Sequence, residues 1–352
     1  AALGRGRLLG GRLLGGRLLG LAGGGLAAAS WPGGAAAQQA RPTGPVDLVI
    51  RSFPINAFAP GSPEQKTFGP LEFRGGLELQ SDHRGFGGLS SLRIEGPGDR
   101  LVAISDRGQW LTARITMEGK AIGGFTEARM APMLAANGRT LSQTGNWDTE
   151  SLWIEGGTAY VGVERTHRIF RFDTFGREGV LARGTSIPVP MGANRLPANG
   201  GIEALGVLPR PSPLAGTLMA ISERGLNDAG DNRAFLIGRE RSSEFAVRRT
   251  NDFDITDLAF LPNGDLLLLE RWFSIWRGIA FRIRRIDSAT IKAGATVDGP
   301  IVLSADMSFQ IDNMEGIAVH RTAEGETIVT LVSDNNFSFL QRTLILQFAW
   351  KG

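Results

Sequence analysis

Short apolar runs separated by polar turns recur along the chain, and residues 309–348 show the repeating unit most clearly. Residues 315–319 alternate into an apolar run, a turn at 323–326 follows, and residues 327–332 form a second, β-branched run. A third apolar run occupies residues 343–348 after a polar connection. Runs of this length, bounded by Gly, Asp and Asn, predict three short strands joined by turns.

The same three-strand unit occurs five times along the chain. Aligned on the first-strand Leu or Ile, successive copies are 53 to 60 residues apart, at Leu92, Leu152, Leu205, Leu258 and Ile317. A lone three-stranded sheet cannot bury both of its faces, whereas sheets stacked radially around an axis can. Units of three or four strands at this spacing therefore predict an all-β fold, a β-propeller with five blades and room for a sixth.

Closure of the ring is expected to involve the N-terminal part of the chain. The last copy runs out of chain after its third strand, so a strand at residues 46–53 or 71–79 should complete that blade. Fourth strands are visible only at residues 244–248 and 299–303. We expect one propeller domain that spans residues 41–352.

Residues 1–40 have a different composition from the rest of the chain. Their first 37 positions hold four arginines and no acid, a glycine-diluted apolar stretch, and three alanines at 35–37. This order is typical of a secretory signal, and the stretch is too weakly apolar for a stable transmembrane helix. We expect export to the periplasm or beyond, with cleavage near Ala37 or Ala40. The alternative is a low-complexity tail without targeting value.

Composition and charge exclude several classes of function. The 352 residues contain no cysteine, which excludes disulfides and thiolate sites. Three histidines argue against a multi-histidine zinc site. Without residues 1–37 there remain 34 basic and 35 acidic residues, a net charge of −1. We therefore expect no nucleic-acid partner, and we expect a monomer.

Glutamates at the start of three first strands are the main candidates for chemistry. Glu150, Glu203 and Glu315 occupy the same place in their copies, where the other two copies have Ser90 and Thr256. The innermost strand of each blade lines the central channel, so equivalent positions converge on the axis. Carboxylates that meet there repel one another unless a cation or arginines neutralise them.

A calcium ion suits such a cluster because it prefers oxygen ligands. Asp334 and Asn335 follow the second strand of the last copy, and antiparallel pairing brings that end beside the start of the first strand. We expect these residues to gather near the axis at one end of the propeller. The alternative is that each glutamate accepts backbone N–H groups or pairs with an arginine. The predicted calcium ligands are Glu150, Glu203, Glu315, Asp334 and Asn335.

Acidic residues also end the second strands, and most of them precede an arginine. Adjacent strand residues face opposite ways, so each side chain is expected to reach the next blade and form a ring of inter-blade salt bridges. The alternative is an arginine-lined mouth that holds phosphate or carboxylate. The predicted second-strand acids are Asp106, Glu164, Glu223, Glu270 and Asp334. The candidate substrate-binding residues are Arg107, Arg224, Arg271 and the loop residue His83.

Several stretches resemble the esterase-like phytase family, a group of exported bacterial propeller proteins. They are residues 87–90, 103–107, 199–205, 266–271 and 312–348. The resemblance implies a propeller and a hydrolase of phosphoesters or other small esters. It implies metal-assisted attack of water on a small anionic or ester substrate. The catalytic carboxylates would then be Glu203, Glu315 and Asp334.

Two other functions fit the same residues. Propellers serve widely as scaffolds, so the chain could bind a ligand or partner without turnover. Six-bladed lactonases also place glutamate and asparagine around Ca²⁺ in the channel, so a calcium-dependent lactonase is the third hypothesis. The sequence contains no G-x-S-x-G, H-E-x-x-H or phosphate-binding loop motif.

Overall fold

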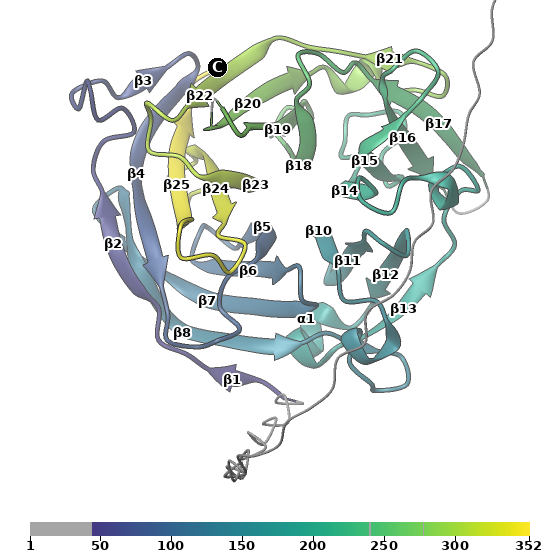
Figure 1. The fold of residues 1–352 in the computed structure, drawn as a ribbon, viewed down its shortest axis with the longest axis horizontal. Helices are drawn as coiled ribbons and strands as arrows, with labels where there is room; N and C mark the ends of the chain where they lie inside the picture. Colours follow the sequence, from purple (N-terminus) through teal and green to yellow (C-terminus); the bar gives the residue numbers. More distant parts are fainter. Residues whose placement is uncertain (1–43, 239–240, 277) are drawn as a thin grey trace, which may run out of the picture. The chain divides into compact units, whose positions relative to one another are not determined.

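The computed structural model describes residues 44–238, 241–276 and 278–352, so the predicted export segment lies outside the described residues. The described chain folds into five sheets arranged as the blades of one propeller, which confirms the predicted fold (Figure 1). In each blade the first strand of the repeat lies innermost, and its second and third strands follow toward the outside. The count is five, and the described residues form no sixth blade.

The first three blades share one strand order. Each has four strands in sequence order from the channel outward, and a short fifth strand pairs at the outer edge. Blade 1 contains β5 (Leu89–Glu95), β6 (Arg100–Ser105), β7 (Gln109–Glu118), β8 (Ala121–Pro132) and β1 (Val46–Asp47). Blade 2 contains β10 (Thr149–Glu155), β11 (Thr158–Val163), β12 (Arg168–Phe172), β13 (Arg183–Ile187) and β9 (Leu134–Ala135). Blade 3 contains β14 (Ile202–Val207), β15 (Leu218–Leu226), β16 (Asn232–Ile237), β17 (Ser242–Val247) and β21 (Thr296–Val297).

The last two blades differ at their outer edges. Blade 4 has four strands, whereas blade 5 takes its outer strands from the N-terminal part of the chain. Blade 4 contains β18 (Asp254–Phe260), β19 (Leu266–Ser274), β20 (Gly278–Ile286) and β22 (Ile301–Asp306). Blade 5 contains β23 (Asn313–Arg321), β24 (Thr327–Asp334), β25 (Thr343–Trp350), β4 (Leu71–Gln80), β2 (Arg51–Ile55) and β3 (Thr67–Phe68). The helical elements are α1 (Phe175–Glu178) and four 3₁₀ turns, η1 (Ser142–Thr144), η2 (Gly179–Leu181), η3 (Ala193–Arg195) and η4 (Ser288–Thr290).

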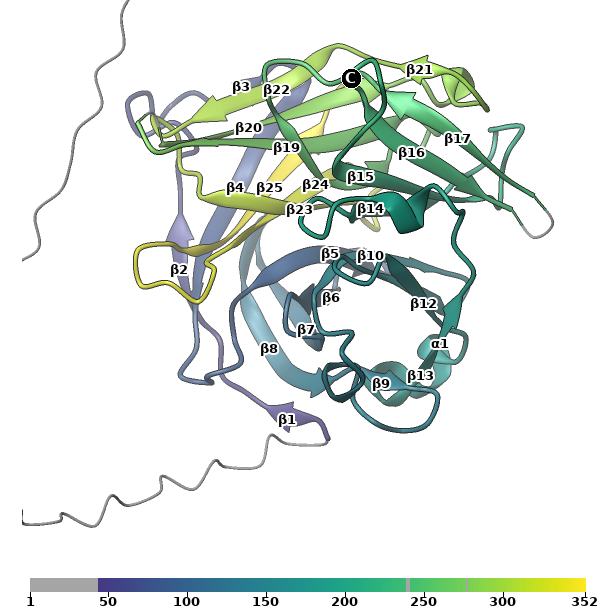
Figure 2. The same ribbon diagram turned by 45° about the vertical axis from the view of Figure 1, so that its right-hand side comes forward.

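Ring closure uses the N-terminal strand, as predicted. Strand β4 pairs with β25 along its whole length, from Leu79 opposite Thr343 to Leu71 opposite Trp350. The single strand predicted at residues 46–53 is wrong, because the chain breaks there into two strands on different blades. Figure 2 shows β1 beside β8 of blade 1 and β2 beside β4 of blade 5. The N-terminal part therefore pairs with both blades that meet at the closure.

The hydrophobic core consists of five clusters, and each cluster fills the space between two neighbouring blades. Between blades 4 and 5, for example, Phe281 of β20 and Phe348 of β25 are fully buried in one cluster with Phe58. Because each sheet buries both of its faces, its central strands carry long apolar runs such as Leu266 to Leu269. The channel strands are thereby held at fixed positions around the axis.

A buried ion pair joins the innermost strands of all five blades. Arg93 of β5 forms a two-pronged contact with Asp257 of β18, at 3.1 and 3.2 Å. The same guanidinium donates to the carbonyl oxygens of Ile317 in β23, at 3.1 Å, and Leu205 in β14, at 3.4 Å. It also lies 5.0 Å from the ring of Trp153 in β10. Arg93 is 7% exposed and Asp257 is fully buried, so this pair forms a central hub.

The fourth strands of blades 1 and 2, β8 and β13, escaped prediction. Strand β8 contains two glycines, a Glu–Ala–Arg step and a terminal proline, and β13 contains only one large apolar residue. Outer strands of a blade are partly exposed and need no continuous apolar run. Within the described residues, no helix has the length and apolar character required to cross a membrane.

Candidate cation site at the acidic end of the channel

Each innermost strand carries a β-bulge at the residue that the sequence alignment made equivalent. In blade 3, Ile202 pairs with Ser222 and Ala204 with Ile221, which leaves Glu203 as the extra residue. The other four inner strands skip one residue at the same place. The bulge residues are Ser90, Glu150, Glu203, Thr256 and Glu315. A bulge redirects the side chain of its extra residue, so the propeller presents three glutamates at one level.

The strand register also aligns the ends of the second strands, and it corrects one prediction. In each blade the residue just before the bulge pairs with a second-strand residue, and the next residue along the second strand is Asp106, Glu164, Glu223 or Asp334 in four blades. In blade 4 that place belongs to Arg271, because Glu270 pairs one residue earlier, with Ile255. Glu270 instead lies buried between Arg282 and Arg284, at 2.7 and 2.6 Å. The predicted second-strand acid of blade 4 is therefore wrong, and an arginine replaces it.

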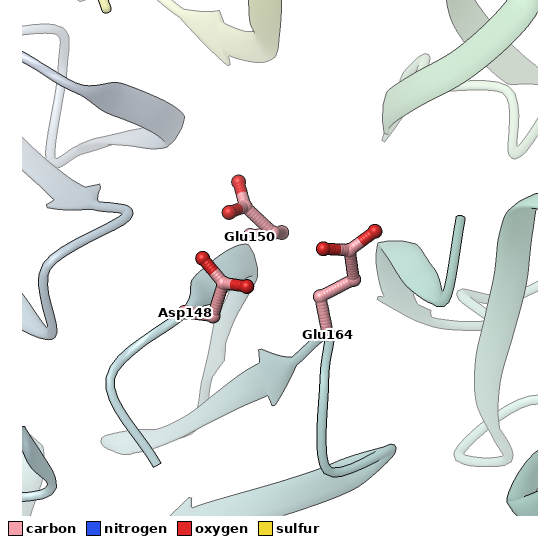
Figure 3. A group of neighbouring side chains, drawn as sticks. All are labelled: Asp148, Glu150 and Glu164. Carbon is pink, nitrogen blue, oxygen red and sulfur yellow. The ribbon is translucent and has the colours of Figure 1, made fainter. Parts of the chain in front are cut away.

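The bulge glutamates and the strand-end acids form two overlapping carboxylate clusters. Asp148, Glu150 and Glu164 offer oxygens that all lie within 4.8 Å of one another, and Figure 3 shows the three carboxylates facing a common space. Glu164, Glu203 and Glu223 form a second group by the same criterion. Glu164 belongs to both groups, so blades 2 and 3 supply one continuous acidic surface.

Hydrogen bonding distinguishes the members of these clusters. Oε1 of Glu164 accepts the N–H of Gly201 at 3.3 Å and that of Gly200. Asp148 pairs with Arg165 at 2.7 Å. Glu203 is only 8% exposed, yet in the part of the chain that the structure describes its carboxylate has neither a hydrogen-bond donor nor a salt-bridge partner. A buried carboxylate without a partner is costly when ionised.

Burial and mutual repulsion shift the protonation of this ring. Burial raises the pKa of Glu150 and of Glu203 well above the ordinary value, and neighbouring carboxylates add to both shifts. Burial likewise raises the pKa of Glu223, Glu315 and Asp334 to about 7, although Arg271 opposes the shift in all three. The ionised ring is thus short of positive charge, as expected for a site that binds a cation.

Arg271 contacts acids of this ring from two blades. Its guanidinium lies 3.0 Å from Glu315 and 3.2 Å from Glu223, and it donates to Oδ1 of Asn313 at 3.2 Å. Glu315 is the largest cause of the raised pKa of Arg271. One arginine of blade 4 thereby connects acids of blades 3 and 5.

Of the five predicted ligands, two belong to the carboxylate clusters and the other three do not. Glu203, Glu315 and Asp334 interact electrostatically, since Glu315 raises the pKa of Glu203 and Asp334 raises that of Glu315. The carboxylate clusters in the described residues include Glu150 and Glu203 but neither Glu315 nor Asp334. The side-chain oxygen of Asn335 accepts the N–H groups of Gly88 and Phe337, at 3.2 and 3.1 Å.

The residues predicted to bind substrate have separate settings. Arg224 is half exposed and pairs with Asp254 at 2.5 Å. The guanidinium carbon of Arg107 lies 3.2 Å from the ring centre of Phe337. His83 lies in the loop between β4 and β5, where Nδ1 accepts the N–H of Gly85 at 3.1 Å. Two of the four contact glutamates of the acidic ring: Arg271 lies against Glu223 and Glu315, and Arg224 lies 3.6 Å from Glu223.

The predicted inter-blade ring of salt bridges exists only in part. Salt bridges join blades 3 and 4, through Arg224 and Asp254, and blades 4 and 5, through Arg271 and Glu315. Hydrogen bonds join the other blades at this end. They are Thr149 Oγ1 to the Ser105 carbonyl at 2.6 Å, Gly201 N–H to Glu164 at 3.3 Å, and Gly88 N–H to Asn335 at 3.2 Å.

Sequence reasoning missed Asp148, Glu164 and Glu223 as candidate ligands. Asp148 stands two residues before Glu150, and this Asp-x-Glu spacing at the start of a strand was the available signal. Glu164 and Glu223 were assigned to inter-blade pairing because each precedes an arginine. The bulge explains why they face the channel, since it places the first-strand glutamate beside the second-strand end.

Comparisons with known proteins give one family. A family model described as phytase-like, esterase-like activity of phytase, matches residues 84–337, which is well over half of the chain. No curated protein sequence matches the chain. Among solved structures, a chain from the Saccharomyces cerevisiae complex of Dbp5 with Nup159, Gle1, IP6 and ADP is 11% identical, with a TM-score of 0.34. That match covers 81% of this chain and 96% of the other, and at that score it carries no argument.

Proposed function

This chain belongs to the phytase-like family, and from that premise we propose that it is an exported propeller that hydrolyses phosphoesters or other small esters with the help of a bound divalent cation. The proposed cation is Ca²⁺, and the proposed site is the acidic end of the channel. The export segment is residues 1–40, and the propeller domain is residues 41–352.

The setting of Glu203 carries this proposal. The residue is 8% exposed, its carboxylate has no protein partner among the described residues, and one of its oxygens lies within 4.8 Å of an oxygen of Glu164 and of Glu223. Either protons or a cation must compensate such a group. An all-oxygen donor set of three or more carboxylates fits a hard cation such as Ca²⁺.

The residues of blades 2 and 3 would hold the cation. Glu150, Glu164 and Glu203 would supply its central ligands, with Asp148 and Glu223 at either side. A bound divalent cation supplies Lewis acidity toward an ester or phosphoryl oxygen. The Gly200 and Gly201 N–H groups orient Glu164 by binding one of its oxygens, which leaves the other oxygen for the site.

The carboxylates of blade 5 would act as general bases. Glu315 and Asp334 have pKa values of about 7 because of burial, and a group that titrates near neutrality can accept a proton from an attacking water. The exposed guanidinium groups of Arg107 and Arg224 would contact the anionic part of a substrate at the mouth, and His83 would contact it from the neighbouring loop.

Hydrolysis of a substrate panel tests this proposal. With calcium, the protein should turn over a chromogenic phosphoester or carboxylic ester, and a chelator should abolish turnover. Asp334→Asn keeps the acceptor for the Asn336 N–H but cannot take up a proton, so kcat should fall by about 100-fold while calcium still binds. The matched control is Glu155→Gln, at the exposed far end of β10, which should leave kcat unchanged.

The same panel separates the alternatives. Turnover of a lactone alone would identify a calcium-dependent lactonase. No turnover of any substrate, together with an unchanged melting temperature on adding calcium, would contradict the proposal and favour a binding propeller without catalysis.

A further inference from the structure

Arg271 occupies a place that a carboxylate holds in the other four blades. In every blade the residue just before the bulge pairs with a residue of the second strand. The next residue of the second strand is Asp106, Glu164, Glu223 or Asp334 in four blades, and it is Arg271 in blade 4. The bulge residue of blade 4 is also the uncharged Thr256. At these two positions blade 4 therefore contributes one positive charge, whereas blades 2, 3 and 5 each contribute two acids.

The contacts of Arg271 overlap with those that a cation would make. Its Nη2 lies 3.2 Å from Glu223, which is also a member of the carboxylate cluster with Glu164 and Glu203. Its Nε lies 3.0 Å from Glu315. The side chain is only a quarter exposed, and salt therefore screens its charge weakly. Arg271 and a cation bound beside Glu203 would share Glu223 and repel each other.

We infer that Arg271 is a built-in counter-ion that lowers the affinity of the acidic site for a divalent cation. It stabilises the ring when no cation is bound, and it competes with the cation for Glu223. This inference rests on the proposed cation site and adds a way in which the site is regulated. Arg271 weakens cation binding, so that the cation can be released. Replacement of Arg271 by a neutral residue should consequently strengthen binding, whereas loss of a residue that merely supports the site would weaken it.

Calcium titration by calorimetry at pH 8 tests the inference on the full chain. Arg271→Gln should bind calcium at least about tenfold more tightly than the wild type, because it removes a unit charge that contacts Glu223 of the partly buried site. Arg271→Lys retains the charge and should bind like the wild type. Arg233→Gln is the matched control, since it removes an equal charge from β16, the third strand of blade 3, where Arg233 pairs with Glu244.

The possible outcomes separate the inference from the proposed function. Tighter binding by Arg271→Gln supports the inference even if the wild type shows no measurable binding. Equal or weaker binding by a folded Arg271→Gln overturns it. Arg271→Gln could also unfold in chelator. Refolding at a calcium concentration below the dissociation constant of the wild type would then support the inference, and failure to refold would overturn it. No binding by either protein overturns both the inference and the proposed site.

Discussion

Replacement of Arg93 by methionine is expected to lower the free energy of unfolding by about 3–5 kcal/mol, the usual cost of removing one partner of a buried ion pair. Asp257 is fully buried, and it would remain without its counter-charge. The carbonyl oxygens of Leu205 and Ile317 would also lose their donor. Urea denaturation measures the effect, because the loss should lower the midpoint.

A surface ion pair of the same blade serves as the control. Arg100 and Glu95 pair at the exposed end of β5, and Arg100→Gln should change the free energy of unfolding by less than about 1 kcal/mol. Asp257→Asn should be as damaging as Arg93→Met, and the double variant should lose less than the sum of the two. Independent, small effects of the two substitutions would contradict the hub.

Without calcium, the melting temperature is expected to fall as the pH rises from 6.5 to 8.5. Glu223, Glu315 and Asp334 have folded-state pKa values of about 7, above their ordinary values. In this window the unfolded chain has already released these protons, so the folded state loses stability as it releases its own. Together the three groups should lower the free energy of unfolding by about 2 kcal/mol between pH 6.5 and 8.5.

Calcium should reduce this dependence on pH, because Glu223 is one of the three titrating groups and lies in the proposed cation site. Since the cation binds the ionised carboxylates, the gain in melting temperature on adding calcium should be small at pH 6.5 and several degrees at pH 8.5. Burial lowers the pKa of His320 to about 4. Protonation of His320 in the unfolded chain therefore destabilises the fold only below pH 6.5, outside the pH range of this measurement. A melting temperature that rises between pH 6.5 and 8.5 in chelator would contradict the assignment.

The fold was predictable because the apolar runs repeat. Inner and middle strands are buried on both faces, so each appears in the sequence as an apolar run, as at Leu266 to Leu269. Outer strands such as β8 face solvent in part and carry no such record. The break of the first predicted strand into β1 and β2 depends on the meeting of blades 1 and 5, which no local pattern encodes.

The site was predictable only as far as the repeat aligned its residues. The equivalence of Glu150, Glu203 and Glu315 was visible in the sequence, whereas the bulge that directs them into the channel was not. A one-residue error in blade 4 put Glu270 where Arg271 belongs.

The central hub left a signal that went unused. Arg93 follows the aligned Leu92, where the other copies have Trp153, Gly206, Ala259 and Ala318. Asp257 precedes the aligned Leu258, where the other copies have Ser91, Ser151, Ala204 and Gly316. Each is the one charged residue of its aligned position, and a single opposite pair on channel strands is the pattern of a central ion pair.

Calcium titration of the wild type and of Glu203→Gln, by calorimetry at pH 8, tests the central claim most directly. Glu203→Gln keeps the size of the side chain and removes the unpaired charge, and Glu155→Gln removes an equal charge at the far end of β10. We predict saturable binding by the wild type and by Glu155→Gln, with at least tenfold weaker binding by Glu203→Gln, about 1.4 kcal/mol. Absence of calcium binding by the wild type, or equal binding by Glu203→Gln, would contradict a cation site at the acidic end of the channel.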